Sequence, residues 1–470
     1  MRSLRALAGL IDHEPELLAL VRRVGRRTSF AEVYAEQHTG EDIMRSTRWL
    51  RVVRSPGLSG FAVRAWAGVR WVEAAGSDFE ASSISQSAEA VERRLSAAGK
   101  IGDPPGISSS LTGRFETRPA RLLSDEGTEA LTQRTDELLA PMRDRPGIRV
   151  ATVSLGWEDH ERLYLNSAGA HCWSRITRSG GSALAVASEA GRTQVDRRHV
   201  GAAGGREITD PFDEQVTATV ADGARAMLAA KAPPTGLMNV ILDPGATATF
   251  SHESLGHGAE ADQFVRNRSY LRPLLGQMIA PEFVTLVDDG TVPGGWGSLP
   301  FDDEGNPGQR TVLIDRGKFV GALHDRSTAA ALGARPTGNT RRATFAHRAY
   351  VRMTNSFLEA GDRELDDLVA EAGDGVLLEN WFSGVEDPAG GQMQIKVLKG
   401  HRIEHGRLTD LLGAMALSRP VLDFLKEIRG IAKRELFEWT PGTCGKGRTE
   451  FLPVGDGGSY VLSRGVIGPT

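Results

Sequence analysis

The stretch FSHESLGHGAEAD, residues 250–262, contains two histidines and, directly after the first of them, a glutamate. In zinc peptidases such histidines bind the metal, and the glutamate accepts a proton from the attacking water. The usual spacing is four residues, which puts both imidazoles on one helical face, but His252 and His257 are five residues apart. At about 100° per residue, a straight α-helix would point these two side chains roughly 140° apart.

The spacing of five leaves three interpretations open. The helix widens locally into a single π-type turn, or it breaks near Gly256, or the two histidines are unrelated. Gly256 and Gly258 flank His257 and lower the cost of a local deformation. Spacing alone therefore does not decide between a metal site and a chance pair, and a third ligand must come from elsewhere in the chain.

Cys444 is the candidate for that ligand. It lies in a polar, glycine-rich stretch, residues 441–447, which is not typical of a core strand. Two histidines and one thiolate bind Zn²⁺ well and leave a fourth position open for water, and Lys446 could help to lower the pKa of the thiol. The alternative is a buried cysteine that acts as a small hydrophobic residue. Cys172, in an alternating stretch, is interpreted as a core residue.

The segment after residue 232 differs from the segment before it. Pro233-Pro234-Thr235-Gly236 is the clearest boundary signal, and short apolar runs separated by Gly, Asp and Asn follow it. The 55 glycines fit a turn-rich, β-rich C-terminal half. We expect an α+β protein with an N-terminal α/β region over 1–232, with a sub-boundary near 102–112, and a mostly β domain over 233–470 that carries the metal-site helix.

The N-terminal region shows alternating helix and strand patterns. The expected elements are a helix over Glu16–Val24, a hairpin over Gly60–Ala74, helices at Ser124–Leu139 and Glu214–Ala230, and separate strands at Ile148–Leu155 and Glu161–Asn166.

Composition narrows the class of protein. Of 470 residues, 40% are hydrophobic and 25% charged, as in globular proteins, and the net charge is −4. These values give no reason to expect a nucleic-acid or membrane partner. Two cysteines argue against a disulfide framework, so we expect a cytoplasmic protein.

Several blocks of the sequence resemble the TldD branch of the TldD/PmbA family. The five-residue spacing from His252 to His257 is itself characteristic of that branch, and Thr443-Cys444-Gly445-Lys446 matches its Cys-Gly-Lys motif. The likeness extends over nearly the full chain, through blocks at 301–307, 309–314, 321–326, 338–341, 352–355 and 361–362.

The resemblance implies a metallopeptidase with one Zn²⁺ per chain. His252, His257 and Cys444 would be the metal ligands and Glu253 the catalytic residue. The family also implies short or unfolded peptide substrates in an enclosed cavity, and a dimer, either a homodimer or a heterodimer with a PmbA/TldE-like subunit. Some family members mature peptide or natural-product precursors. Departures at residues 383–387 and at Glu450 put a shared substrate range in doubt.

Three further residues have two interpretations each. Asp262, like Glu260, is either a partner that orients a zinc-bound imidazole or a solvent-facing carboxylate. His324 binds substrate or stabilises an oxyanion, or it belongs to a structural hydrogen-bond network. Arg352 holds a substrate carboxylate or forms a buried ion pair.

The predicted function is therefore zinc-dependent peptide hydrolysis. Two alternatives stay open: a metal-dependent hydrolase of a non-peptide amide or biosynthetic intermediate, and a non-catalytic partner subunit. The intact His252, Glu253, His257 and Cys444 argue against the second of these alternatives.

Overall fold

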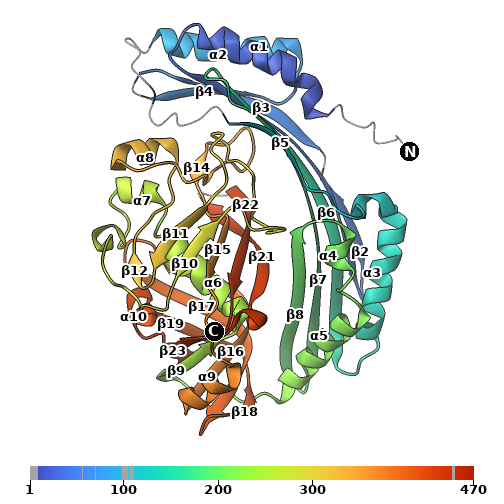
Figure 1. Ribbon diagram of the computed structural model, residues 1–470. Coiled ribbons are helices and arrows are strands. Elements are labelled where there is room, and N and C mark those ends of the chain that lie inside the picture. Colours follow the sequence, from blue (N-terminus) through green and yellow to red (C-terminus); the bar gives the residue numbers. More distant parts are fainter. Residues whose placement is uncertain (1–8, 56, 69, 98–103, 105–110, 447–449) are drawn as a thin grey trace.

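The computed structural model describes residues 9–55, 57–68, 70–97, 104, 111–446 and 450–470 (Figure 1). The predicted α+β class is confirmed: an N-terminal region of helices on a long sheet is followed by a mostly β C-terminal region (Figure 1). The sub-boundary expected at 102–112 lies almost entirely outside the described residues. Within the part of the chain that is described, no helix combines the length and the apolar character that a membrane crossing requires.

The N-terminal sheet has eight strands in the order β4-β3-β1-β6-β7-β5, with β2 on β1 and β8 on β7. The strands are β1 (Ala31–Ser46), β2 (Leu50–Arg54), β3 (Leu58–Trp66), β4 (Trp71–Gly76), β5 (Thr112–Glu116), β6 (Ile148–Asn166), β7 (His171–Glu189) and β8 (Arg192–Ala203). At 19 residues each, β6 and β7 are roughly 60 Å long. The hairpin predicted over Gly60–Ala74 is confirmed as β3 and β4.

The prediction of two separate strands between residues 148 and 166 is wrong, because β6 runs without a break. The polar segment between them pairs continuously with β1 on one side and β7 on the other. This segment is polar because it faces a cavity, and not because it forms a turn. Glu158 and His160 line this cavity, which lies between the sheet and the C-terminal region.

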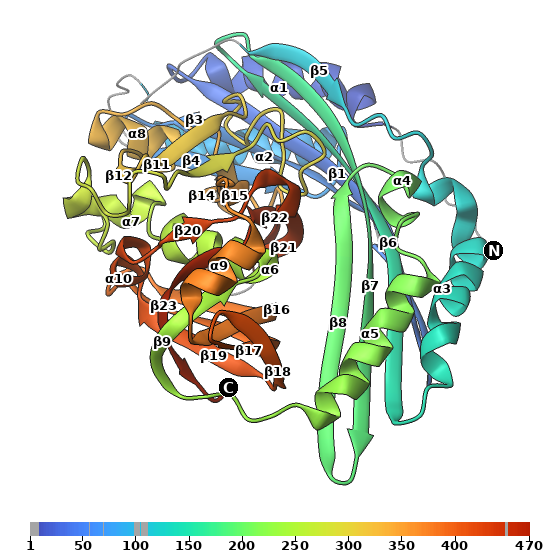
Figure 2. The same ribbon diagram turned by 60° about the horizontal axis from the view of Figure 1, so that its bottom comes forward.

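Helices cover the two ends of this curved sheet, and the C-terminal region lies on the inner side of the curve (Figures 1 and 2). The helices are α1 (Glu14–Gly25), α2 (Ala81–Ser96), α3 (Gly127–Arg143), α4 (Arg206–Thr209) and α5 (Glu214–Ala226). The helix predicted from Ser124 begins instead at Gly127, because Leu123–Glu126 forms a 3₁₀ turn. The helix predicted to end at Ala230 ends at Ala226 and continues as a 3₁₀ turn, Met227–Ala229.

Two sheets form the C-terminal region. Strand pairing in the first closes on itself through β16-β9-β23-β19-β17 and back to β16, with β18 and β20 attached. Its strands are β9 (Gly236–Leu242), β16 (Gly375–Asp387), β17 (Gln392–Glu404), β18 (Arg407–Leu412), β19 (Met415–Pro420), β20 (Gly430–Ile431) and β23 (Val461–Gly468). Closure leaves few free edges and gives a rigid support for the elements packed on it.

The second sheet has the order β12-β11-β10-β15-β22-β21. Its strands are β10 (Leu286–Asp289), β11 (Arg310–Asp315), β12 (Lys318–Phe319), β15 (Asn355–Leu358), β21 (Glu438–Lys446) and β22 (Glu450–Gly458). A small pair, β13 (Thr340–Arg341) and β14 (Tyr350–Val351), stands apart. The remaining helical segments are α6 (Pro244–Ser251), a π turn (His252–Gly256), α7 (Ala261–Val265), α8 (Arg326–Leu332), α9 (Leu365–Ala372), α10 (Val421–Lys426) and three 3₁₀ turns (Leu10–His13, Arg272–Leu274, Arg434–Leu436).

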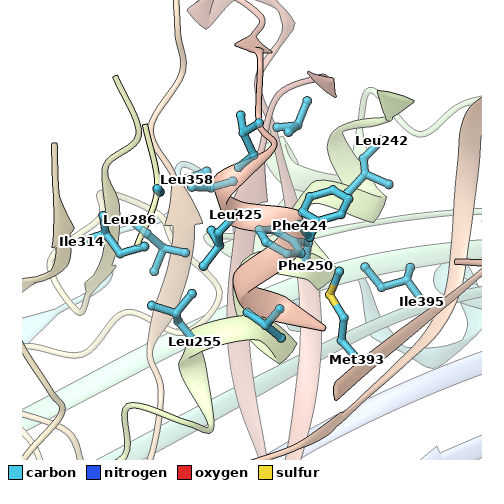
Figure 3. Packing of buried hydrophobic residues seen from close by; sticks show 14 of the residues in the cluster. Leu242, Phe250, Leu255, Leu286, Ile314, Leu358, Met393, Ile395, Phe424 and Leu425 are labelled. Carbon is cyan, nitrogen blue, oxygen red and sulfur yellow. The ribbon is translucent and has the colours of Figure 1, made fainter. Parts of the chain in front are cut away.

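Helix α6 is buried between these two sheets. Every residue from Ala246 to Ser251 is buried, and the ring centroid of Phe250 lies 4.6 Å from that of Phe424. Leu242, Met393 and Ile395 complete this part of the core (Figure 3). Burying one such large side chain stabilises the fold by about 1.5–3 kcal/mol, so the helix that leads to His252 is held firmly.

Candidate metal centre

The start of α6 is fixed by its sequence. Asp243 ends the connection from β9 and caps the helix, since its Oδ1 accepts a hydrogen bond from the backbone N–H of Ala246 at 2.7 Å. Pro244 occupies the first helical turn, where a missing N–H costs nothing. The closed sheet therefore sets the position and direction of the helix that carries the histidines.

The spacing of five is accommodated by a π turn. Residues His252–Gly256 form a π-helical segment that continues α6, so the first of the three interpretations is confirmed. The wider turn brings the two imidazoles together, with ring centroids 5.1 Å apart and planes at 84°. Gly256 is required for packing as well: a Cβ there would lie 1.9 Å from Sδ of Met353.

Cys444 reaches the same point from the far end of the chain. Alternation along β21 leaves Thr443 exposed and Cys444 buried, and Sγ of Cys444 lies 3.5 Å from Nε2 of His257. One possible ligand atom from each of His252, His257 and Cys444 falls within 4.8 Å of the others. Three residues that are distant in sequence thus converge on one small volume.

This donor set fits a zinc ion. Tetrahedral zinc with Zn–N near 2.05 Å and Zn–S near 2.3 Å requires donor atoms roughly 3.3–3.6 Å apart, and the Sγ–Nε2 distance of 3.5 Å agrees. Burial alone would raise the pKa of the Cys444 thiol, but the charges of His252 and His257 and their hydrogen bonds outweigh burial and lower the pKa well below its ordinary value. A thiolate is the form that binds zinc.

Glu253 follows the first histidine and is half-buried. Its stem lies against Gly384 of β16, where a Cβ would be 2.6 Å from Cγ of Glu253, so only glycine leaves room for this carboxylate. Burial raises the pKa of Glu253, and the neighbouring His252 and His257 oppose that rise. A raised pKa suits a group that first accepts and then returns a proton.

Asp456 orients His252 and was not found from the sequence. Its Oδ1 lies 3.0 Å from Nδ1 of His252, and this contact leaves Nε2 free to face a ligand. Asp456 pairs with Thr440 across the β21–β22 hairpin. Cys444 follows Thr440 by four residues, which in a strand means the same face. The position of Asp456 near Cys444 and His252 follows from the register of this hairpin, and no short sequence motif indicates it.

The carboxylates after His257 are arranged around Lys446. Oε2 of Glu260 lies 3.6 Å from Nδ1 of His257, while Nζ of Lys446 is 2.9 Å from Glu260 and 2.9 Å from Asp262. Asp262 is thus placed beside the lysine, and Glu260 is the carboxylate next to the imidazole. Burial raises the pKa of Glu260, but the charges of Lys446 and His257 and their hydrogen bonds together outweigh burial and lower this pKa to about 2.

The other two residues singled out from the sequence lie outside the His–His–Cys group. Arg352 is fully buried and donates a hydrogen bond to the carbonyl oxygen of Cys444, so it contacts the backbone of β21. His324 is held through its backbone by Thr337, and burial lowers its pKa to about 4.

Glu386 is a further acidic residue at this site. A Cβ on Gly258 would lie 3.1 Å from Oε1 of Glu386, and both carboxyl oxygens are buried without a hydrogen-bond partner among the described residues. Burial raises the pKa of Glu386 to about 9. It lies in β16 and places a carboxyl group beside the candidate metal centre.

Glu386→Gln is expected to stabilise the metal-free protein at alkaline pH. The unfolded chain ionises this carboxyl near pH 4.3, and the folded chain only near pH 9. The wild type therefore loses stability as the pH rises between these two values, and the glutamine variant does not. Urea unfolding should show the variant more stable by about 1–3 kcal/mol at pH 8 and equal to the wild type at pH 4. Equal stabilities at both pH values would contradict the assignment.

Asp456→Asn is expected to weaken zinc binding about 10–100-fold, because partners that orient a metal-bound imidazole have effects of that size. Competition with a chromophoric chelator measures the affinity. Asp362→Asn, at an exposed position, is the matched control. An unchanged affinity in Asp456→Asn would show that the contact with His252 does not support metal binding.

Comparison with known proteins agrees with this geometry. Residues 119–228 match the model of the PmbA/TldA metallopeptidase central domain, and residues 235–466 match that of the C-terminal domain. A metalloprotease of Methanothermobacter thermautotrophicus is 32% identical over 94% of this chain and 95% of its own. A metalloprotease of Methanocaldococcus jannaschii is 34% identical over 68% of this chain and 70% of its own.

Among solved structures, TldE from Thermococcus kodakarensis has the same fold. Its TM-score is 0.75 at 17% identity, over 96% of this chain and 99% of that one. The full-length relatives, the two matched domains and the shared fold lead to one conclusion: this chain belongs to the PmbA/TldA metallopeptidase family.

Proposed function

We propose that this chain is a zinc-dependent peptidase of the TldD type that hydrolyses short or unfolded peptides. The observation that carries the proposal is the convergence of His252, His257 and Cys444, with Glu253 on the same π turn. The names of the relatives support it, since they are described as metalloproteases.

The mechanism assigns one task to each side chain. When bound, the zinc ion would polarise the scissile carbonyl and lower the pKa of water. His252 and His257 would hold it through nitrogen and Cys444 through sulfur. Glu253 takes the proton from the attacking water on its carboxylate and delivers it to the leaving amine. Asp456 keeps the His252 ring in position during both steps.

A partner subunit is the second element of the proposal. The fold is shared with TldE over almost the whole chain, which supports pairing with a TldE-like subunit or with a second copy of this chain. Maturation of a modified peptide precursor by such a dimer is a narrower form of the same activity. Glu386 keeps one alternative open, a hydrolase of a non-peptide amide or biosynthetic intermediate, because its carboxyl oxygens are buried beside the site without a hydrogen-bond partner among the described residues.

A cleavage assay separates these functions. The zinc-loaded chain is incubated with a mixture of unfolded peptides, with and without a candidate TldE-like subunit, and products are read by mass spectrometry. Peptide cleavage in either arm supports the proposal. If zinc is bound stoichiometrically but no peptide is cleaved in either arm, the non-peptide hydrolase becomes the better assignment. If no zinc is retained, the metallopeptidase proposal fails.

A further inference from the structure

A cavity of about 250 Å³ lies between the inner face of the N-terminal sheet and the β21–β22 hairpin. Its lining is unusually rich in charged side chains, and four of them are arginines. The cavity, here called the basic pocket, is lined among others by Arg162, Arg178, Arg341 and Arg342 and by the carboxylates Glu36, Glu158 and Asp303.

Each carboxylate of the basic pocket already has a cationic or imidazole partner. Glu158 binds Nη1 of Arg178 at 2.8 Å, Asp303 binds Nη1 of Arg162 at 3.2 Å, and Glu36 contacts Nε2 of His160 at 2.8 Å. Arg342 is bound outside the pocket lining, by Glu73, with Nη1 3.0 Å from Oε1.

Arg341 is left without a counterion. It is only 5% exposed, and its Nη1 donates a hydrogen bond to the carbonyl oxygen of Met353 at 2.8 Å. Among the described residues, no carboxylate lies within ion-pair distance of its guanidinium. Burial, together with the nearby charge of Arg178, lowers the pKa of Arg341 to about 9. An uncompensated buried charge is costly, and a bound anion would remove this cost.

Arg178 offers a second donor in the same cavity. Its Nε donates to the carbonyl oxygen of Trp296 at 2.7 Å and its Nη1 is bound to Glu158. Its Nη2 has no hydrogen-bond partner among the residues that the structure describes. Guanidinium groups match planar and tetrahedral oxoanions with two parallel N–H donors.

From this arrangement we propose that the basic pocket binds a small oxoanion, a carboxylate or a phosphate group, through Arg341 and Arg178. Access is available, because a larger cleft of about 1030 Å³ shares His38, Arg178 and Thr443 with the basic pocket. The anion would lie behind the ligand strand rather than on the metal. Thr443 faces the pocket, while its neighbour Cys444 points to the opposite face of β21.

Two sources could supply such a group: a free oxoanion, or the carboxyl terminus of a peptide that enters through the larger cleft. The first arm of the test uses inorganic phosphate and the full-length zinc protein in isothermal titration calorimetry. We expect one site per chain in the wild type and in Arg335→Met, an exposed arginine that serves as control. We expect at least a tenfold weaker affinity in Arg341→Met.

Ala343→Phe is a second variant that tests the same site in case Arg341→Met does not fold. Ala343 also lines the basic pocket, so the larger side chain should block the anion while every arginine stays in place. Phosphate binding that persists unchanged in both variants would place the anion elsewhere, for example at the metal, and would overturn the proposal.

The second arm distinguishes the two sources. A hexapeptide with a free carboxyl terminus and the same peptide as a carboxamide are titrated into Glu253→Gln, which should not cleave them. Tighter binding of the acid, by tenfold or more and lost with Arg341→Met, identifies the peptide terminus as the occupant. Equal binding of both peptides together with phosphate binding identifies a free oxoanion. Absence of both phosphate binding and acid preference overturns the proposal.

Discussion

Glu253→Gln is expected to reduce peptide hydrolysis about 10²–10⁴-fold in kcat while the chain keeps its zinc. The amide has the shape of the carboxylate, so it should fit against Gly384 as Glu253 does. It cannot accept a proton from water at neutral pH, and the leaving amine then has no proton donor. Since Glu253 is not one of the three converging donors, metal content should not change.

The measurement combines single-turnover cleavage of an unfolded peptide with metal analysis of the same preparation. Glu282→Gln, at an exposed position on the connection before β10, is the matched control and should behave as the wild type. Loss of zinc from Glu253→Gln would mean that this residue is a ligand. Retention of more than about a tenth of the activity would mean that another group accepts the proton.

The sequence singles out His252, His257 and Cys444, which the structure brings together, but it indicates only partly how they meet. The residue types and order of His252 and His257 are typical of a metal site, and their spacing indicates that a regular helix would not bring both imidazoles together. The π turn brings the two imidazoles together, and it forms at the end of α6, which is packed between two sheets. Burial of residues such as Phe250 stabilises this part of the fold and offsets the free-energy cost of the local deformation.

The residues that the sequence did not reveal are those fixed by long-range pairing. Asp456 comes to His252 only through the register of the β21–β22 hairpin, and Glu386 comes to Gly258 only through the position of β16 beside α6. The same cause explains the wrong prediction of two strands in β6. Its polar middle part pairs on both sides, and pairing partners cannot be inferred from the alternation of one strand.

Arg352 is a residue for which the sequence leaves two roles open. A buried arginine near a metal site fits either role by residue type. In the structure it donates a hydrogen bond to the carbonyl oxygen of Cys444. This contact adds support to the backbone of β21 at Cys444. The position of the thiolate therefore depends on β21, and the arginine supports that strand.

Cys444→Ser is expected to lower the affinity for zinc by about 10²-fold or more, because a neutral hydroxyl replaces a thiolate among three ligands. Such a loss corresponds to about 2.7 kcal/mol of binding free energy. The thiol is strongly activated by His252 and His257, so the wild type should bind zinc with release of few protons from Cys444. Serine, whose hydroxyl stays protonated, cannot provide the same charge.

The other cysteine provides a control within the same chain. Cys172 is buried, its Sγ donates to the carbonyl oxygen of Leu111 at 3.1 Å, and burial raises the pKa of its thiol to about 12. Cys172→Ser keeps this hydrogen bond and should leave zinc affinity unchanged. Cobalt substitution gives a direct readout, since a thiolate ligand produces a charge-transfer band in the near ultraviolet. The band should persist in Cys172→Ser and vanish in Cys444→Ser; if it persists in Cys444→Ser, the third ligand is not this thiolate and the role of β21 in forming the metal centre is wrong.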